Sequence, residues 1–294
     1  MKRFFILASA AIVALASCAK TQVVYNDAPE EISFKKITGV MTKDGDEPVT
    51  SRISGTMGVF ADHILDGATT TTYFKNIPFT GTNTSSWVGN PKQYYPLSGT
   101  LDFVAYMPYD DDDENPVAKY DNENNTLALT WAGTEDLLYS EKLTGVSKPQ
   151  AAADQKIVFS HALTKIAIKV TFDEEIEVTN FSLTDVYKSG TYTVNYDSFS
   201  VKDGRWNIDG VASESWSKSP TSDEVYETYI VPSEMTSIVL TYNAADTEGL
   251  THTITLPTEK WLEGTQYNYN ITVTPIEITF APEVVIWDQV TPTI

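Results

Sequence analysis

The sequence predicts an all-β protein built from two antiparallel β-sandwich domains in tandem. Short segments in which apolar and polar residues alternate recur along the chain, and 16 Tyr and 12 Phe accompany many Thr and Val. No segment has the period of a long amphipathic helix, although residues 135–143 could form a short one. The longest β-like run, at residues 156–172, contains neither Gly nor Pro and changes phase midway.

This phase change predicts the joint between the two domains. Ile157, Phe159 and Leu163 occupy odd positions, whereas the apolar residues that follow occupy even ones: Ile166, Ile168, Val170 and Phe172. Because side chains alternate between the faces of a strand, this switch requires a bulge, a kink or a new partner sheet near Thr164. The preceding SKPQAAADQ is small, polar and Pro-containing, as linkers are.

The remaining strand candidates fall on both sides of the joint. In the first half they are residues 31–41, 56–61, 100–107 and 126–131. In the second half they are residues 191–201, 225–231, 238–242, 250–256, 267–273 and 276–280. Strands that are apolar on one face only and follow one another at short spacing predict antiparallel sheets packed face to face. No period of 20–50 residues indicates a solenoid or a propeller.

Length and charge narrow the classes of function. A chain of 294 residues is long enough for two domains that each bury a core. A formal charge of −20 argues against nucleic acid or an anionic membrane surface as a partner, since both attract basic proteins. A single Cys excludes a disulfide framework.

The N-terminus has the features of an export signal. Lys2 and Arg3 precede an apolar run at residues 4–15, too short to span a bilayer stably. Leu15-Ala16-Ser17-Cys18 then resembles the lipobox of a bacterial lipoprotein, in which the Cys is acylated. We therefore expect a signal peptide at residues 1–17 and a lipid-proximal tether at 18–30, with an ordinary secretory signal as the alternative.

The motifs of catalysis and metal binding are missing from the sequence. His63, His161 and His252 have no metal-ligand spacing, and there is no GxSxG, Walker or GxGxxG motif. We expect His161 and His252 to be satisfied or half-buried members of their strands. The acidic run at residues 110–114 could bind calcium but is better interpreted as a solvated turn. The sequence thus predicts no enzyme, no cofactor and no metal.

Several segments together resemble the fimbrillins of Bacteroidetes, the FimA-like and Mfa-like pilus subunits and anchors. They are the lipobox at Cys18, ISF at residues 32–34, Arg52 in the following loop, YYPLSGTLDFVAYMP at 94–108, EDLLYS at 135–140, VFSHALTKIAIKVTF at 158–172, YNYNITVTPI at 267–276 and VVIWDQV at 284–290. The resemblance covers essentially the whole chain, and the segments around 103–108 and 161–166 are its more specific parts.

The resemblance implies a fold, a location and an assembly mechanism. The two domains, at residues 31–155 and 156–294, would be transthyretin-like sandwiches. Cys18 would carry the lipid that anchors the protein in the outer membrane at the cell surface, and Arg52 would be the cleavage site that releases the first strand. That displaced strand contains Ile32, Phe34 and Ile37, and a strand from another fimbrial subunit would replace it.

Two functions stay open at this point. The first is a structural subunit of a fimbrium (stalk, anchor, or accessory or tip protein) that supports adhesion. The second is a surface lipoprotein that never polymerises and binds a glycan or another host or bacterial surface ligand through exposed aromatic side chains. Arg52 in an exposed loop favours the first, because a simple binding module does not need a removable first strand.

Overall fold

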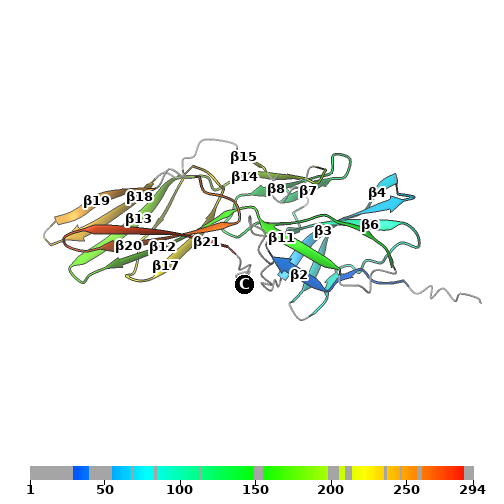
Figure 1. The fold of residues 1–294 in the computed structure, drawn as a ribbon, viewed down its shortest axis with the longest axis horizontal. Coiled ribbons are helices and arrows are strands. Elements are labelled where there is room, and N and C mark those ends of the chain that lie inside the picture. Colours follow the sequence, from blue (N-terminus) through cyan, green and yellow to red (C-terminus); the bar gives the residue numbers. More distant parts are fainter. Residues whose placement is uncertain are drawn as a thin grey trace, which may run out of the picture.

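The structure, a computed structural model, describes residues 29–39, 55–67, 69–82, 85–112, 114–148, 155–197, 205–208, 214–234, 237–245, 247–256 and 260–287. Every element assigned in these ranges is a β-strand, as predicted. Figure 1 shows an elongated molecule with a group of strands at each end of its long axis. The short helix expected at residues 135–143 is wrong, because this segment instead contains strand β9 (Leu138–Ser140).

The largest sheet lies in the N-terminal half and has the order β1-β5-β4-β3-β6-β9-β11-β2, with β10 paired to β6. Its other strands are β1 (Ser33–Phe34), β2 (Lys36–Gly39), β3 (Gly55–Leu65), β4 (Thr69–Gly81), β5 (Trp87–Gly89), β6 (Thr100–Met107), β10 (Leu143–Val146) and β11 (Lys156–His161). β1 and β2 are separated only by Lys35, yet they occupy opposite ends of this order. The sheet must therefore curl round until its two edges meet at the first strand.

Each face of this sheet covers a different core. Val59 and Phe103 point into the curled sheet, together with Ile32, Phe34, Phe79 and Trp87. Phe60 and Tyr106, on the opposite face, pack against a smaller sheet with the order β15-β14-β8-β7. This explains why β6 is buried at nearly every position instead of at alternate ones.

The smaller sheet combines strands from both sides of residue 155. It consists of β7 (Ala118–Asp121), β8 (Thr126–Trp131), β14 (Gly190–Asn195) and β15 (Arg205–Asn207). β14 pairs with β8 over six residues, and both lie beside the N-terminal group of strands in Figure 1. β14, and through it β15, is thus joined by hydrogen bonds to the half of the chain that precedes the expected boundary.

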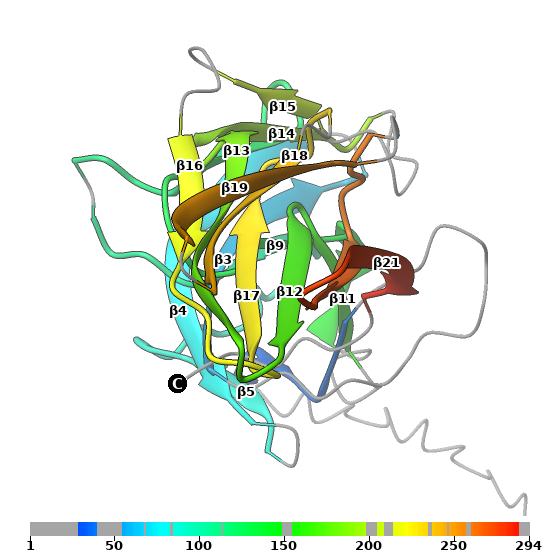
Figure 2. The same ribbon diagram turned by 90° about the vertical axis from the view of Figure 1, so that its left-hand side faces the viewer.

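The C-terminal half contains two further sheets, with the orders β17-β12-β20-β21 and β16-β13-β18-β19. Their strands are β12 (Thr164–Phe172), β13 (Ile176–Val186), β16 (Glu214–Lys218), β17 (Val225–Ile230), β18 (Ser237–Ala244), β19 (Thr247–Thr255), β20 (Thr265–Val273) and β21 (Ile278–Ile286). One shared core unites the two sheets, with Ile168, Phe181, Leu240, Trp261 and Tyr269 among its buried members. Figure 2 shows these two layers from their end of the molecule.

Residues 156–172 change partner sheet, as the phase switch predicts. β11 pairs with β9 and β2 in the N-terminal sheet, whereas β12 pairs with β17 and β20 in the C-terminal one. Ala162 and Leu163, between the two strands, are both fully buried.

The expectation of purely antiparallel sheets is wrong at two places. β2 runs parallel to β11, and β12 runs parallel to β20. In each pair the two strands lie far apart in the chain, so no tight hairpin forces them to be antiparallel. The expectation that His252 is half-buried is also wrong, since its side chain is exposed and β19 lies at the edge of its sheet.

Candidate functional site: the place of the first strand

The first strand contributes large apolar side chains to the N-terminal core. Ile32 and Phe34 are completely buried, and Ile37 is partly buried against the same cluster. The Phe34 ring lies 5.3 Å from that of Phe79 and 5.2 Å from that of Phe103, the second at an interplanar angle of 90°. Such edge-to-face pairs add to the burial of the ring itself.

Backbone hydrogen bonds hold the segment before β1 in place. The Ile32 N–H donates to the Gln93 carbonyl over 2.8 Å, and the Tyr95 N–H donates to the Glu30 carbonyl over 2.9 Å. Tyr95 packs into the same core, where burial and, to a smaller extent, the negative charge of Glu30 together raise the pKa of its hydroxyl to about 12. The segment is therefore bonded on one side to the chain that leads from β5 to β6.

Its continuation is bonded to the opposite edge of the sheet. β2 pairs with β11 at four positions, whereas β1 pairs with β5 through Ser33–Val88 and Phe34–Trp87. An ion pair joins Lys92 and Glu31 at 2.7 Å, but we expect little stability from it because the Lys92 side chain is mostly exposed. The first strand thus closes the curled sheet chiefly by apolar burial and backbone pairing.

Removal of this strand would expose both edges at once. β5 and β11 would each lose a hydrogen-bonded neighbour, and the places of Ile32 and Phe34 in the core would become empty. Burial of each side chain contributes roughly 1.5–3 kcal/mol, as an upper estimate. An open edge next to an apolar groove is a template for the addition of another strand.

The two covalent sites expected from the sequence, Cys18 and Arg52, lie outside the described residues. The connectivity still places Arg52 between the end of β2 at Gly39 and the start of β3 at Gly55. A cut after Arg52 would therefore separate the first strand from the rest of the chain. Of the strand residues expected from the sequence, the structure brings Ile32, Phe34 and Ile37 together in one core.

The comparisons with known proteins agree with this architecture. A family model described as fimbrillin-like matches residues 52–288. The chain belongs to the fimbrillin-like family. No curated protein matches it.

Three solved structures from Bacteroides species share the fold of this fimbrillin-like protein. A proposed cell adhesion protein of Bacteroides uniformis ATCC 8492 has 20% identity and a TM-score of 0.60, over 89% of this chain and 99% of the other. One from Bacteroides ovatus ATCC 8483 has 18% identity and a TM-score of 0.54, over 88% and 97%. A fimbrial protein of Bacteroides vulgatus ATCC 8482 has 20% identity and a TM-score of 0.53, over 87% and 99%.

In this fimbrillin-like chain, a second group of contacts fixes the end of β21 to the joint. The His161 side chain is fully buried, and its Nδ1 lies 2.6 Å from Asp136 Oδ2. Its ring stacks on Trp287, which stacks in turn on Tyr229. The expectation of a satisfied histidine is met at Nδ1, while the buried Nε2 has no hydrogen-bond partner among the described residues. Sequence reasoning missed Asp136, which lies 25 positions away.

In the acidic run at residues 110–114, carboxylates accept hydrogen bonds from backbone N–H groups of the turn that follows. Asp112 Oδ1 accepts hydrogen bonds from the Glu114 and Asn115 N–H groups, and Asp110 Oδ2 accepts one from the Val117 N–H. The described part of the chain holds no group of three or more potential metal ligands. It also contains no helix that is long and apolar enough to cross a membrane.

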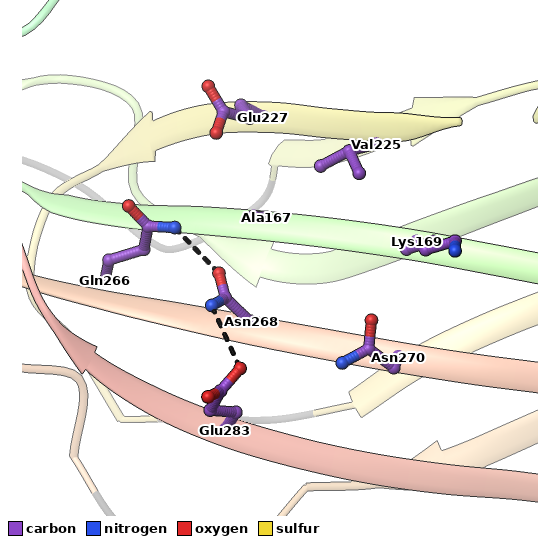
Figure 3. A pocket seen from close by; sticks show the side chains of 8 residues that line it. All are labelled: Ala167, Lys169, Val225, Glu227, Gln266, Asn268, Asn270 and Glu283. Carbon is purple, nitrogen blue, oxygen red and sulfur yellow. Dashed lines mark hydrogen bonds between the residues drawn. The ribbon is translucent and has the colours of Figure 1, made fainter. Parts of the chain in front are cut away.

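A shallow hollow of about 220 Å³ lies on the outer face of the sheet β17-β12-β20-β21. Its lining is mostly polar and includes Lys169, Glu227 and Asn270. Figure 3 shows a row of side chains across it, in which Gln266 donates to Asn268 Oδ1 over 2.8 Å and Asn268 donates to Glu283 over 3.4 Å. Such a row offers hydrogen bonds but no aromatic platform.

Proposed function

We propose that this protein is a structural subunit of cell-surface fimbriae, as a stalk, anchor, or accessory or tip component. It is exported as a lipoprotein, with Cys18 acylated and held in the outer membrane, and it assembles by strand exchange after cleavage at Arg52. The observation that carries the proposal is the double role of the first strand. Its Phe34 fills the core, and its backbone closes the two edges of one sheet.

The intact precursor stays monomeric under this proposal. Its own first strand fills the groove at the high effective concentration of a covalently attached segment. After cleavage the strand competes only as a free peptide, so a strand from a neighbouring subunit can take its place. The incoming strand restores both the apolar burial and the hydrogen bonds to β5 and β11.

The proposal also includes a domain architecture for the subunit and an outcome for the lipid on Cys18. The subunit consists of two transthyretin-like sandwiches, at residues 31–155 and 156–294, with β14 and β15 reaching back across the boundary. Cleavage after Arg52 removes Cys18 together with the first strand, so a polymerised subunit loses its lipid. An anchor subunit would keep it.

The test compares cleaved and uncleaved protein. Purified precursor is treated with an Arg-specific protease, and its size is followed by light scattering. We expect the wild type to polymerise after cleavage and Arg52→Ala to stay monomeric, with Lys43→Ala in the same loop as a control that polymerises like the wild type. If the clipped wild type stays monomeric, or if Arg52→Ala polymerises as readily, the proposed mechanism is overturned.

One observation favours the alternative of a non-polymerising surface protein that binds a glycan or host ligand. The hollow lined by Gln266, Asn268 and Glu283 presents amide and carboxylate groups that can bond to hydroxyls. Titration with oligosaccharides, followed by NMR of the side-chain amides, checks this function. Shifts that are absent in Asn268→Ala would support it.

A further inference from the structure

A cluster of hydrogen-bonded polar side chains connects the largest sheet to the smaller sheet packed on it. Lys142 lies between β9 and β10, Asn125 lies in the turn between β7 and β8, and Asp62 is on β3. Lys142 Nζ is 2.8 Å from Asn125 Oδ1 and 3.1 Å from the Tyr120 hydroxyl. The Asp62 side chain is only 2% exposed, and its Oδ1 has no hydrogen-bond partner among the described residues.

This arrangement places an amine, a carboxamide and a buried acid within reach of one another. We propose that Lys142 and Asn125 join in an intramolecular isopeptide bond, with Asp62 as the group that accepts the proton of the lysine. The lone pair of Nζ forms a bond to Asn125 Cγ, the bond from Cγ to Nδ2 breaks, and the nitrogen leaves as ammonia. The reaction exchanges one amide for another and requires no oxidant, reductant or added reactant.

The first step is the removal of a proton from the Lys142 ammonium, because only a neutral amine is a nucleophile. Asp62 Oδ2 lies 3.8 Å from Nζ, and the Tyr120 hydroxyl bridges them, accepting from Nζ and donating to Asp62 over 2.8 Å. A proton can pass through this hydroxyl to the carboxylate. Burial raises the pKa of Asp62, so the carboxylate is a stronger base than an exposed one. Transfer also neutralises two partly buried charges.

The second step is the attack on Cγ, which places negative charge on Asn125 Oδ1. The Tyr120 hydroxyl lies 3.2 Å from this oxygen. It has one proton, so it donates either to Asp62 or to Asn125. Once Asp62 is protonated the hydroxyl is free to turn to Oδ1, where its donation stabilises the charge that develops there.

The third step is the departure of ammonia. Asn125 Nδ2 donates to Asp197 Oδ1 over 2.6 Å, which holds the leaving nitrogen on the side away from Lys142. One proton from the attacking nitrogen passes to Nδ2, and the proton held by Asp62 converts the released ammonia to ammonium. The net change is an ammonium on Lys142 exchanged for a free ammonium ion, so charge is conserved.

A second carboxylate competes for the lysine. Asp102 Oδ2 lies 3.6 Å from Nζ, and Asp102 Oδ1 accepts from the Gly145 N–H over 2.8 Å. Neither acid forms as short a contact with Nζ as Asn125 does. The aromatic ring of Tyr120, 5.7 Å from Nζ and packed beside Phe60, shields one side of the cluster from water. The geometry therefore favours Asn125 as the acceptor.

The bond would fix two sheets to each other. It joins the turn before β8 to the segment after β9, and β8 is the strand that pairs with β14 from the second half of the chain. A covalent link at this place would resist heat and pulling forces that separate the sheets. It needs only the folded chain, so it does not depend on the proposed strand exchange.

The test is the mass of the purified full-length protein and its tryptic peptides. We expect the wild type to be lighter than its sequence by one ammonia. Trypsin should not cut after Lys142, so residues 120–142 should stay joined to the following peptide. Lys142→Arg should have its full mass, because arginine keeps the charge but is not a nucleophile. The Asp62→Asn variant should have its full mass in most molecules. Lys119 is an exposed lysine on β7, and the Lys119→Arg variant should still be lighter than its sequence by one ammonia.

Each other outcome overturns the proposal. A wild-type peptide of residues 120–142 that is released at its full mass excludes the bond, whatever the variants do. A loss of ammonia that persists in Lys142→Arg indicates a succinimide at Asn125. A loss of water in place of ammonia indicates a bond to Asp62 or Asp102, which contradicts the assigned acceptor.

Discussion

The imidazole ring of His161 stacks on the indole ring of Trp287, with the ring centroids 3.7 Å apart and the planes 16° from parallel. His161 ends β11 at the joint between the two halves, and Trp287 follows the last residue of β21. On its other side Trp287 lies 5.3 Å from the ring of Tyr229, on β17. The stack thus links the end of the described chain to the segment that connects the two groups of strands.

The first prediction concerns this stack. Trp287→Ala should lower the free energy of unfolding by about 3–5 kcal/mol, because it empties a buried site and removes two ring contacts. Trp287→Phe keeps an aromatic ring, so it should lower the free energy of unfolding clearly less than Trp287→Ala does. Chemical denaturation at fixed pH measures both. If the alanine variant lies within about 0.5 kcal/mol of the wild type, as surface substitutions do, the stack contributes little.

The second prediction concerns pH and uses two carboxylates with opposite shifts. Burial raises the pKa of Glu141 above its ordinary 4.5, although Lys156 opposes this. The folded state therefore binds the proton more tightly than the unfolded state, and its stability decreases as the pH rises from 4.5 through the folded pKa. Glu141→Gln should be more stable than the wild type at pH 7, and this gain should vanish below pH 4.5.

Asp121 provides the matched case of the opposite sign. Hydrogen bonds from the Asn124 side chain and backbone hold the pKa of this exposed carboxyl below its ordinary 3.8. The contribution of the Asp121 carboxylate to the stability of the folded state is complete above pH 3.8 and is lost as the pH falls through the folded pKa. Asp121→Asn should therefore be less stable than the wild type at pH 7. Thermal unfolding between pH 3 and 7 measures both variants, and slopes of the same sign would contradict the assignment.

A third prediction concerns a glycine that the core requires. A Cβ on Gly58 would lie 2.1 Å from Tyr106 Cε1 and 2.6 Å from Asn76 Oδ1. Tyr106 is fully buried and donates to that same oxygen, so neither group can move without breaking the contact. Gly58→Ala should destabilise the protein by at least about 1–3 kcal/mol. Gly133→Ala, whose Cβ would have ordinary contacts of 3.7 and 3.8 Å, is the control and should change the melting temperature little.

The sequence predicts the all-β fold class and the passage of residues 156–172 from one sheet to another, because both depend on the local alternation of apolar and polar residues. β6 (Thr100–Met107) and β8 (Thr126–Trp131) have the expected bounds, since their apolar residues alternate regularly. β4 (Thr69–Gly81) was missed because its first residues are a run of Thr and few of its side chains are buried. A positive φ at Asn76 and shifts in register further obscure the pattern there.

The candidate site was predictable only where its residues are neighbours in the chain. Ile32 and Phe34 occupy even positions and Ile37 an odd one, so the rule that located the joint could also have predicted the split between β1 and β2. That these strands close opposite edges of one sheet depends on pairings across more than 50 residues. Likewise, nothing in the local sequence associates Asp62 with Lys142, because folding alone brings them together.

The last prediction tests whether the place of the first strand can be refilled from outside. After cleavage at Arg52, a synthetic peptide of residues 29–39 carries the same Ile32 and Phe34 side chains and the same backbone groups for β5 and β11. In excess, it should occupy the groove and keep the clipped protein monomeric, because assembly requires that groove. Light scattering at increasing peptide concentration measures the effect.

The matched control is the same peptide with Phe34→Ala. Truncation of a buried Phe costs about 3–5 kcal/mol, and each 1.4 kcal/mol is tenfold in affinity, so this peptide should inhibit at least about 100-fold more weakly. A peptide with Ser33→Ala, which keeps both buried side chains, should inhibit like the wild-type peptide. Equal inhibition by the Phe34→Ala and wild-type peptides would mean that Phe34 does not anchor the strand, and assembly would then depend on another surface.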